Sequence, residues 1–381
     1  MHTIELGERA QLALDTVHRR PTRGIPSWLV HVMEHASIER LAGTAPGTYR
    51  QDPDRVYLAY QNAIGTCAID QWIPTNPLSM GSGGYEAPDA KGATQGAERI
   101  EIDGVEIDGP EDVIEHMQRF TFPRLREAIA TFDEDQRVRE ILAHEAAVQD
   151  ILAPDILKTG YGFISFPTFA YGAYGYEGYF MAYALYPEVM EAHFALQADL
   201  ALLNNRAAAR AYREGGLPPM YRLDHDMTDS RGTLVDIRSL DRIWFPQLAR
   251  CLEPVLQTDA NLLWHCDGNI SDMAPRLVEI GVRGFQGFQY EDGVDYQRIC
   301  RMKARDGQPL MIIAGVSVTT TLPHGTPADV RRQLDWLVEH GPRTGLFLAC
   351  SSSVTPGVPW DNIRTLIEGL RHYQRVGRDG A

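Results

Sequence analysis

The 381-residue chain contains no apolar run approaching the roughly 18 consecutive residues needed to span a bilayer. It also lacks a C-x-x-C pair, and its N-terminus does not resemble a signal peptide. The five cysteines are widely spaced, at positions 67, 251, 266, 300 and 350. We therefore expect no membrane segment and a location in the reducing cytoplasm.

Positive charge is scarce as well. The sequence has 36 Lys and Arg against 51 Asp and Glu, which gives a formal net charge of −15. Proteins that bind nucleic acid phosphates need clustered Lys and Arg, so we expect no nucleic acid partner. The composition, 44% hydrophobic and 23% charged, is typical of a soluble globular enzyme.

Short apolar runs alternate with helical patterns from Lys158 onward, which indicates repeated β-α units and a parallel sheet. Predicted strands cover residues 161–169, 220–227, 261–268, 284–291, 309–317 and 345–353, with two more at 24–32 and 67–74. Eight such strands predict an α/β fold, a closed (β/α)8 TIM barrel that forms a single domain over residues 1–381.

Residues 75–110 are expected to be an insertion into this barrel. The stretch "RIEIDGVEIDGPEDV" predicts a hairpin that turns at Asp103-Gly104, before a helix from about Pro110. Residues 79–96 are rich in Gly, Ser and Ala and predict a mobile loop, which is either a lid or a plain surface loop. A later helix is predicted to begin after the N-cap Thr326 and to end at Gly341.

The stretch "LLWHCDGNI" ends an apolar run in three residues that carry chemistry. Because side chains alternate along a strand, His265 and Asp267 share one face and Cys266 lies on the other. The active site of a TIM barrel lies at the carboxyl ends of its strands, so we expect His265 and Asp267 to point into the barrel mouth.

The same alternation pairs Asp224 with Asp226 and Gln289 with Glu291. We expect these carboxylates to converge with His265 on one cavity. The alternative is structural, because a histidine at a strand end is often only hydrogen-bonded and Asp before Gly is a common turn maker.

The run "FAYGAYGYEGYFMAYALY", residues 169–186, places tyrosines between glycines. Its rings can stack on a ligand or pack in the core of the following helix. Three serines follow the last predicted strand at 351–353 and suit either a turn or an anionic group.

Four segments resemble, in kind and order, the uroporphyrinogen decarboxylase superfamily, which includes the cobalamin-dependent methyltransferases that load coenzyme M. They are "DPDRVYLAYQNAIGTCAID", "WHCDGNI", "HGTPADVRRQL" and "VPWDNIRTLIEGL". The resemblance extends over nearly the whole chain.

The sequence departs from the decarboxylases at their early motif P-x-W-x-x-R-x-x-x-R. It reads "PSWLVHVMEH" here, so His31 and His35 stand in place of the arginines that hold the substrate carboxylates. Neutral imidazoles do not replace a bidentate charge, which disfavours porphyrinogen decarboxylation. Tyr174 falls near that family's active-site tyrosine, and Ser352 stands in place of its late histidine.

The methyltransferase branch binds zinc through H-x-C and a late cysteine. His265 matches its histidine, whereas Asp267 and Ser352 stand at the two cysteine positions. Cys266 and Cys350 are out of register, so the usual zinc thiolate site is not encoded. A harder divalent metal site built from His265, Asp267, Asp226 or Glu291 is the remaining option.

We therefore expect a diverged enzyme that transfers a methyl group on a small substrate, with a methylcobamide delivered by a corrinoid protein. The expected catalytic residues are His265, Asp267, Tyr174, Asp226 and Glu291, of which His265 and Asp267 would hold the metal, zinc in the family. The expected substrate-binding residues are His31, His35, Asp70, Tyr171, Tyr176, Gln289 and Ser352. The alternatives are a metal-free decarboxylase or lyase and a non-catalytic barrel that binds a small molecule; the sequence also permits a homodimer.

Overall fold

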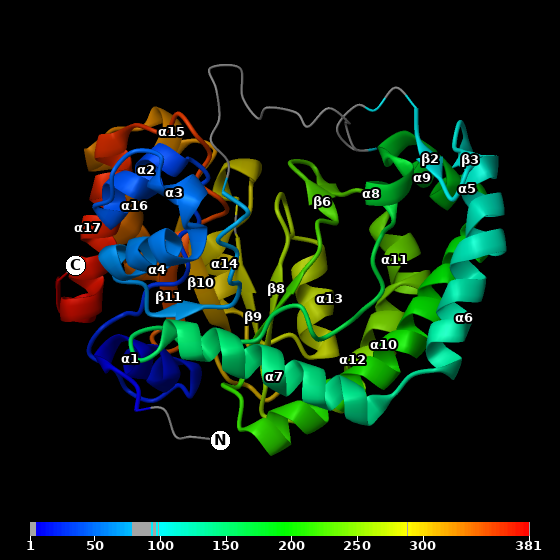
Figure 1. Cartoon of the computed structure of the whole chain (residues 1–381), viewed down its shortest axis with the longest axis horizontal. Coiled ribbons are helices and arrows are strands. Elements are labelled where there is room, and N and C mark those ends of the chain that lie inside the picture. Colours follow the sequence, from blue (N-terminus) through cyan, green and yellow to red (C-terminus); the bar gives the residue numbers. More distant parts are fainter. Residues whose placement is uncertain (1–4, 78–92, 94–96, 98, 288, 381) are drawn as a thin grey trace.

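The computed structural model of the protein describes residues 5–77, 93, 97, 99–287 and 289–380 (Figure 1). The strands are β1 (Ala68–Ile69), β2 (Glu101–Ile102), β3 (Val105–Glu106), β4 (Leu157–Lys158), β5 (Met220–Asp224), β6 (Thr228–Asp229), β7 (Gly232–Thr233), β8 (Asn261–His265), β9 (Gly284–Gln286), β10 (Met311–Val316) and β11 (Leu346–Cys350).

Helices lie on both sides of the central strands (Figure 1). They are α1 (Glu8–Val17), α2 (His35–Ala42), α3 (Thr48–Gln51), α4 (Pro53–Ile64), α5 (Pro110–His116), α6 (Phe122–Ala130), α7 (Glu134–Leu152), α8 (Tyr171–Tyr174), α9 (Tyr176–Leu185), α10 (Pro187–Gly215), α11 (Ile237–Ile243), α12 (Phe245–Leu256), α13 (Met273–Ile280), α14 (Tyr296–Arg301), α15 (Thr321–His324), α16 (Pro327–His340) and α17 (Trp360–Val376). A π-helical stretch covers Met117–Thr121, and 3-10 helices cover Tyr290–Asp292 and Gly377–Gly380.

Five parallel strands form the main sheet, in the order β11-β10-β9-β8-β5. Apolar side chains from its strands are buried on both faces, as expected for a parallel sheet covered by helices. The register pairs Asp224 with His265 and His265 with Gln286. The final residues of three adjacent strands therefore lie side by side at one edge of the sheet.

A second parallel sheet pairs β1 with β4. Single parallel bridges connect it to the main sheet, from Gly160 to Tyr221 on one side and through Trp28 and Ser27 on the other. Across the described residues the strands thus form a parallel α/β arrangement, and the ladders do not run continuously around a closed barrel.

Two predicted strands differ from the structure. Residues 24–32 contribute only single bridges. Residues 161–169 are irregular, and the strand lies just before them, as β4. Side chains replace the strand ladder there, because Tyr221 accepts from the backbone N–H of Ile164 at 2.6 Å and Asn205 accepts from that of Ser165 at 2.9 Å.

Two local predictions agree with the structure. β2 and β3 form the expected antiparallel hairpin, with φ of 56° at Asp103 and 75° at Gly104. α16 has Thr326 as its N-cap, with Pro327 in its first turn and Gly341 directly after its end. Most of the predicted loop at 79–96 lies outside the described residues. No helix in the described ranges is long and apolar enough to cross a membrane.

Candidate active site

Three side chains at the carboxyl ends of β5 and β8 form a compact group. Asp224 ends β5, Asp226 follows it by two residues, and His265 ends β8. One ligand-type atom from each lies within 4.8 Å of the others. His265 is buried, Asp224 is half-buried and Asp226 is exposed, so the group opens toward solvent on one side. The parallel register of β5 and β8 brings the two strand ends together.

Asp267 lies next to this group. Its backbone N–H donates to Asp226 Oδ1 at 2.9 Å, and its carboxylate accepts from Ser352 Oγ at 3.3 Å. Asp267 Oδ1 is 3.9 Å from His265 Nε2 and is buried without a hydrogen-bond partner. Burial raises the pKa of Asp267, with a further contribution from Asp226, although His265 opposes the shift.

The imidazole of His265 packs against the backbone at the end of β9. His265 Nδ1 lies 3.3 Å from the carbonyl oxygen of Gln286, and Nε2 faces Asp267. The next residue, Gly287, has φ of 83°, and a Cβ there would clash with the imidazole. A histidine that hydrogen-bonds a carbonyl through Nδ1 can present Nε2 to a metal.

Arg222 was not singled out from the sequence, yet it connects the site to Asp70, which directly follows β1. Its Nε donates to Asp70 at 2.5 Å and its Nη1 to Asp224 at 2.6 Å. Its side chain is 7% exposed and that of Asp70 is fully buried. The available signal was its position in "MYRLDHDM", where it shares a strand face with Asp224.

Tyr161 completes this part of the site. Its hydroxyl donates to Asp224 Oδ2 at 3.1 Å, and its ring lies 4.7 Å from the guanidinium of Arg222. Burial acts to raise the pKa of Asp224, but His265 and Arg222 outweigh it, so the pKa is lowered. Asp224 therefore stays ionised beside His265.

Glu291 does not join the group, which corrects the prediction that it converges with His265. Its carboxylate accepts hydrogen bonds from Ser317 Oγ at 2.6 Å and from Thr319. β9 ends at Gln286, so the strand alternation does not extend to Glu291. Gln289 instead accepts from the backbone N–H of Gly268 at 2.8 Å and holds the turn that follows Asp267.

Tyr174 is also outside the group. Its hydroxyl lies 2.9 Å from His116 Nδ1 and 3.3 Å from Thr121 Oγ1. His116 in turn contacts Asp103 of the hairpin, through Nε2 at 2.9 Å. Tyr174 therefore lies against the end of α5, near the β2-β3 hairpin, and outside the group of Asp224, Asp226 and His265.

Tyr171 lies closer to the group, because its hydroxyl donates to the carbonyl oxygen of Asp226 at 2.9 Å. It stacks between Tyr176, with ring centroids 4.8 Å apart, and His225, at 6.0 Å. Tyr176 is half exposed. These rings form a rim beside Asp226.

The two early histidines hold the chain at residues 76–77. His31 contacts Tyr57 at 3.1 Å and Asn76 at 2.8 Å, and burial lowers its pKa. His35 Nε2 lies 2.7 Å from the carbonyl oxygen of Pro77. Both histidines therefore contact neighbouring protein groups, and neither position carries the arginine of the decarboxylase motif.

Neither out-of-register cysteine belongs to the group. Cys266 is buried and accepts from the backbone N–H of Met227 at 3.1 Å. Burial raises the pKa of both Cys266 and Cys350 to about 12. Neither thiol is among the ligand-type atoms that converge with Asp224, Asp226 and His265.

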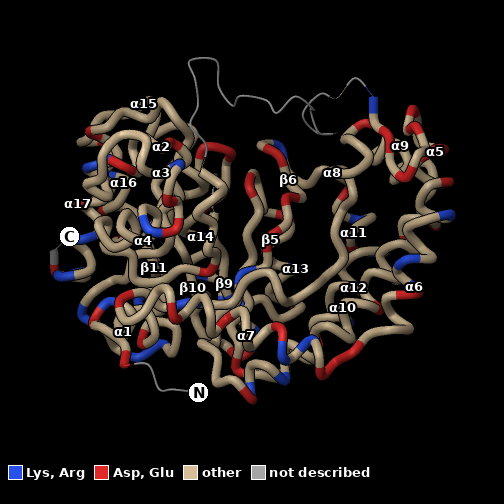
Figure 2. Tube along the Cα trace, in the orientation of Figure 1, with Lys and Arg blue, Asp and Glu red and all other residues tan. Residues whose placement is uncertain are grey.

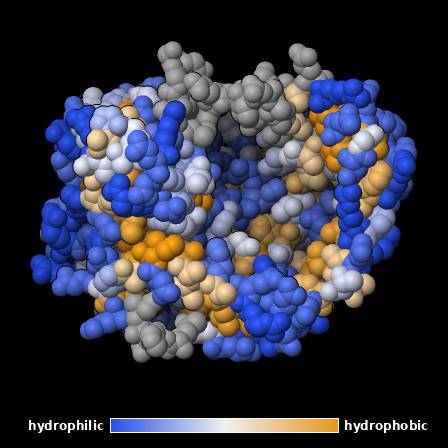
Figure 3. Space-filling model, viewed as in Figure 1, coloured by the Kyte–Doolittle hydropathy of each residue, from blue (hydrophilic) through white to orange (hydrophobic). Residues whose placement is uncertain are grey.

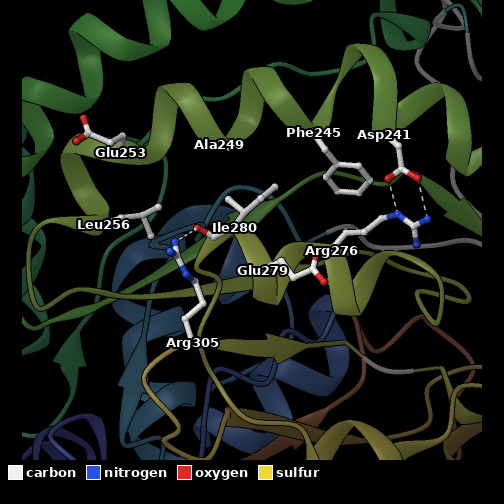
Figure 4. Close-up of a pocket in the computed structure, with 9 residues that line it drawn as sticks. All are labelled: Asp241, Phe245, Ala249, Glu253, Leu256, Arg276, Glu279, Ile280 and Arg305. Atoms are coloured by element: carbon white, nitrogen blue, oxygen red, sulfur yellow. Dashed lines mark hydrogen bonds and ion pairs between the residues drawn. The ribbon is translucent and has the colours of Figure 1, made fainter.

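A cavity of about 260 Å³ adjoins the group and is lined by Arg222, Asp224, Tyr161, Ser165, Phe166 and Thr168 among others. In the view of Figure 3 the molecule is hollowed in its middle, and hydrophilic residues line much of the visible hollow. The groove of Figure 4 is different: it lies between α12 and α13, is crossed by the Asp241–Arg276 ion pair, and contains no strand-end residue.

No protein-family model and no curated protein matches the chain. Among solved structures, a methyltransferase from Methanosarcina mazei has a TM-score of 0.56 and 15% sequence identity, over 96% of this chain and 98% of that one. A Listeria monocytogenes protein assigned as a vitamin-B12-independent methionine synthase has a TM-score of 0.43 and 12% identity, over 95% and 98% of the two chains. The first likeness shows a common α/β fold over almost the entire chain.

Proposed function

We propose that the protein is a diverged member of the uroporphyrinogen decarboxylase superfamily that binds a divalent metal and transfers a methyl group on a small substrate. The observation that carries the proposal is the group of Asp224, Asp226 and His265, whose ligand-type atoms lie within 4.8 Å of one another. The bridges that link the two parallel sheets support the barrel of that superfamily as the complete architecture.

The charge around the group supports a cation. Asp70, Asp224, Asp226 and Asp267 provide four carboxylates, and among the described residues Arg222 is the one arginine or lysine that contacts any of them. Two buried carboxylate oxygens, Asp70 Oδ1 and Asp267 Oδ1, have no hydrogen-bond partner. A buried carboxylate oxygen without a partner is costly, and a divalent ion beside Asp267 would offset that cost for Asp267 Oδ1.

The residues present fit a metal such as zinc. His265 Nε2 and one oxygen each from Asp224 and Asp226 would hold it, with Asp267 as a nearby fourth group. A zinc ion in such a site acts as a Lewis acid that makes a bound acceptor more nucleophilic. Arg222 and Tyr161 orient Asp224, while the Ser352 hydroxyl and the Asp226 carboxylate position Asp267.

The methyl donor in this proposal is a methylcobamide carried by a corrinoid protein. Its support is the sequence resemblance, together with the fold shared with the methyltransferase. The acceptor would take the methyl group and lose a proton, while cobalt keeps the electron pair as cob(I)alamin. The tyrosine rim at Tyr171 and Tyr176 offers flat rings at the entrance for a planar ligand.

The test uses the purified protein with zinc, methylcobalamin and thiol or phenol acceptors. We expect the methylcobalamin absorbance to fall as the methyl group is transferred. His265→Ala and Asp226→Asn should slow this fall by at least about a hundredfold, because each removes a proposed metal ligand. Cys266→Ser serves as the control and should keep wild-type activity. Equal activity in His265→Ala and the wild type would contradict the proposal.

Asp267 favours a second candidate, a metal-free decarboxylase or lyase. Its buried Oδ1 lacks a partner, and its raised pKa suits an acid that delivers a proton to a carbanion. This reaction would proceed fully after chelation, whereas methyl transfer at the proposed metal site would stop. Release of carbon dioxide from small carboxylated substrates, measured with and without a chelator, separates the two.

A further inference from the structure

A pocket of about 370 Å³ lies at the end of the molecule opposite the candidate active site. It is lined by the loop after α1, by the residues that lead into β11, and by the chain that follows α17. Gly345 and Leu346 stand at the start of β11, whereas the candidate active site lies at the ends of β5 and β8. The pocket is therefore separate from that site.

Arginines dominate the pocket although the protein carries a net charge of −15. Arg20, Arg23, Arg343 and Arg378 line it, together with one acid, Asp379. Figure 2 shows basic positions next to the C-terminus. Arg20 pairs with Asp15 at 2.8 Å, so four guanidinium groups face two carboxylates and leave an excess of two positive charges.

The arginines differ in how they are used. Arg378 donates to the backbone carbonyls of Val338 and Gly341 at the end of α16 and is thereby fixed. Arg23 and Arg343 are exposed and form no ion pair among the described residues. Burial, and to a smaller degree the charge of Arg343, lowers the pKa of Arg378. Arg343 and Arg378 therefore lie close to each other, and neither forms an ion pair with a described residue.

The wall that carries Arg23 is rigid. Gly24 packs against the backbone of Gln374, and Gly377 packs against the backbone of Arg23, so closely that neither glycine can carry a Cβ without a shift. The backbone N–H of Ile25 also donates to the carbonyl of Tyr373 at 3.0 Å. The loop after α1 is thus locked onto the end of α17, which holds Arg23 in place.

We propose that this pocket binds the phosphoryl group of a small phosphorylated molecule. Guanidinium groups bind phosphate oxygens in bidentate fashion, and a phosphate monoester carries nearly two negative charges at neutral pH, which matches the local excess. The volume lies within the roughly 300–1,000 Å³ of small-molecule sites. The proposal does not depend on the function proposed for the other end.

Calorimetric titration with inorganic phosphate and with pyrophosphate, at constant ionic strength, tests the site. We expect one saturable site per chain for at least one of these probes. Arg343→Gln and Arg23→Gln should each weaken it by at least about tenfold. The matched control is Arg139→Gln, on the exposed face of α7, because it changes the total charge by the same amount. Its phosphate affinity should stay within about twofold of the wild type, since Arg139 does not line the pocket.

Four outcomes overturn the proposal. One is the absence of saturable binding of both probes to the wild type. Another is an equal loss in Arg139→Gln and Arg343→Gln, which would show a general charge effect. The third is loss of binding in Asp226→Asn, which would move the phosphate to the candidate active site. If vesicles of phosphatidylglycerol bind in an Arg343-dependent way while both phosphates fail to bind, the pocket is a lipid contact and the proposal is wrong. Melting curves check that Arg343→Gln folds.

Discussion

Replacing Arg222 by methionine is expected to destabilise the protein far more than the loss of an ordinary surface ion pair. The guanidinium connects Asp70 and Asp224, at 2.5 Å and 2.6 Å, and is 7% exposed. Methionine keeps much of the side-chain volume but leaves the carboxylate of Asp70 buried without its partner. Asp70 Oδ1 already has no hydrogen bond, so no other group replaces the lost contact.

The size of the effect follows from this burial. Breaking a buried pair by removing one partner costs about 3–5 kcal/mol, because the remaining charge is uncompensated. The matched control is Arg364→Met on α17, whose pair with Asp361 is 57% and 66% exposed. An exposed pair of this kind contributes less than about 1 kcal/mol.

The free energy of unfolding is measured by urea titration for the wild type, for the single variants Arg222→Met, Asp70→Asn and Arg364→Met, and for the double variant Asp70→Asn/Arg222→Met. We expect the double variant to be more stable than the sum of Arg222→Met and Asp70→Asn implies, since neither charge then remains alone. If Arg222→Met costs no more than Arg364→Met, the buried network around Asp224 does not exist as described.

Three further predictions concern other parts of the chain. Burial lowers the pKa of His193 from 6.5 to about 4. As the pH falls from 6.5 to 4 the unfolded chain binds a proton that the folded chain does not, so stability is lost. In urea titrations at pH 6.5 and pH 4, His193→Leu should lose about 3 kcal/mol less of its free energy of unfolding on acidification than the wild type does. An equal loss in the variant and the wild type would contradict this role of His193. Tyr174→Phe should lower the free energy of unfolding by about 1–3 kcal/mol, because Nδ1 of buried His116 loses its hydrogen bond to the Tyr174 hydroxyl. The kcat for methyl transfer should stay within about twofold of the wild type. A large fall in kcat would show that Tyr174 acts in catalysis. Uroporphyrinogen should show no saturable binding at micromolar concentration, about −8 kcal/mol, because His31 and His35 hold Asn76 and Pro77 and supply no fixed charge; tight binding would show that the substrate clamp survives in another form.

The convergence of Asp224, Asp226 and His265 could be predicted from the sequence for a definite reason. Each lies at or just after the end of a strongly apolar run, and parallel strands bring their carboxyl ends to one edge. The same prediction does not hold for Glu291, because β9 ends at Gln286 and a 3-10 helix covers Tyr290–Asp292. Alternation of side chains cannot be extended beyond the last strand residue.

The remaining errors come from contacts that the sequence does not display. The partner of Tyr174 is His116, 58 residues earlier, at the end of α5. Arg222 and Asp70 are 152 residues apart, and their pairing requires the arrangement of β1 and β5. The run 161–169 is apolar enough for a strand, but Tyr221 and Asn205 supply its hydrogen bonds from side chains.

Elemental analysis of the purified protein and its variants is the most direct test of the proposed metal site. We expect stoichiometric divalent metal in the wild type, loss of that metal in His265→Ala and Asp226→Asn, and wild-type metal content in Cys266→Ser and Cys350→Ser. The oxygen and imidazole ligands lie within 4.8 Å of one another, whereas both thiols are buried with raised pKa values. Metal retained in His265→Ala, or lost in either cysteine variant, would contradict the account.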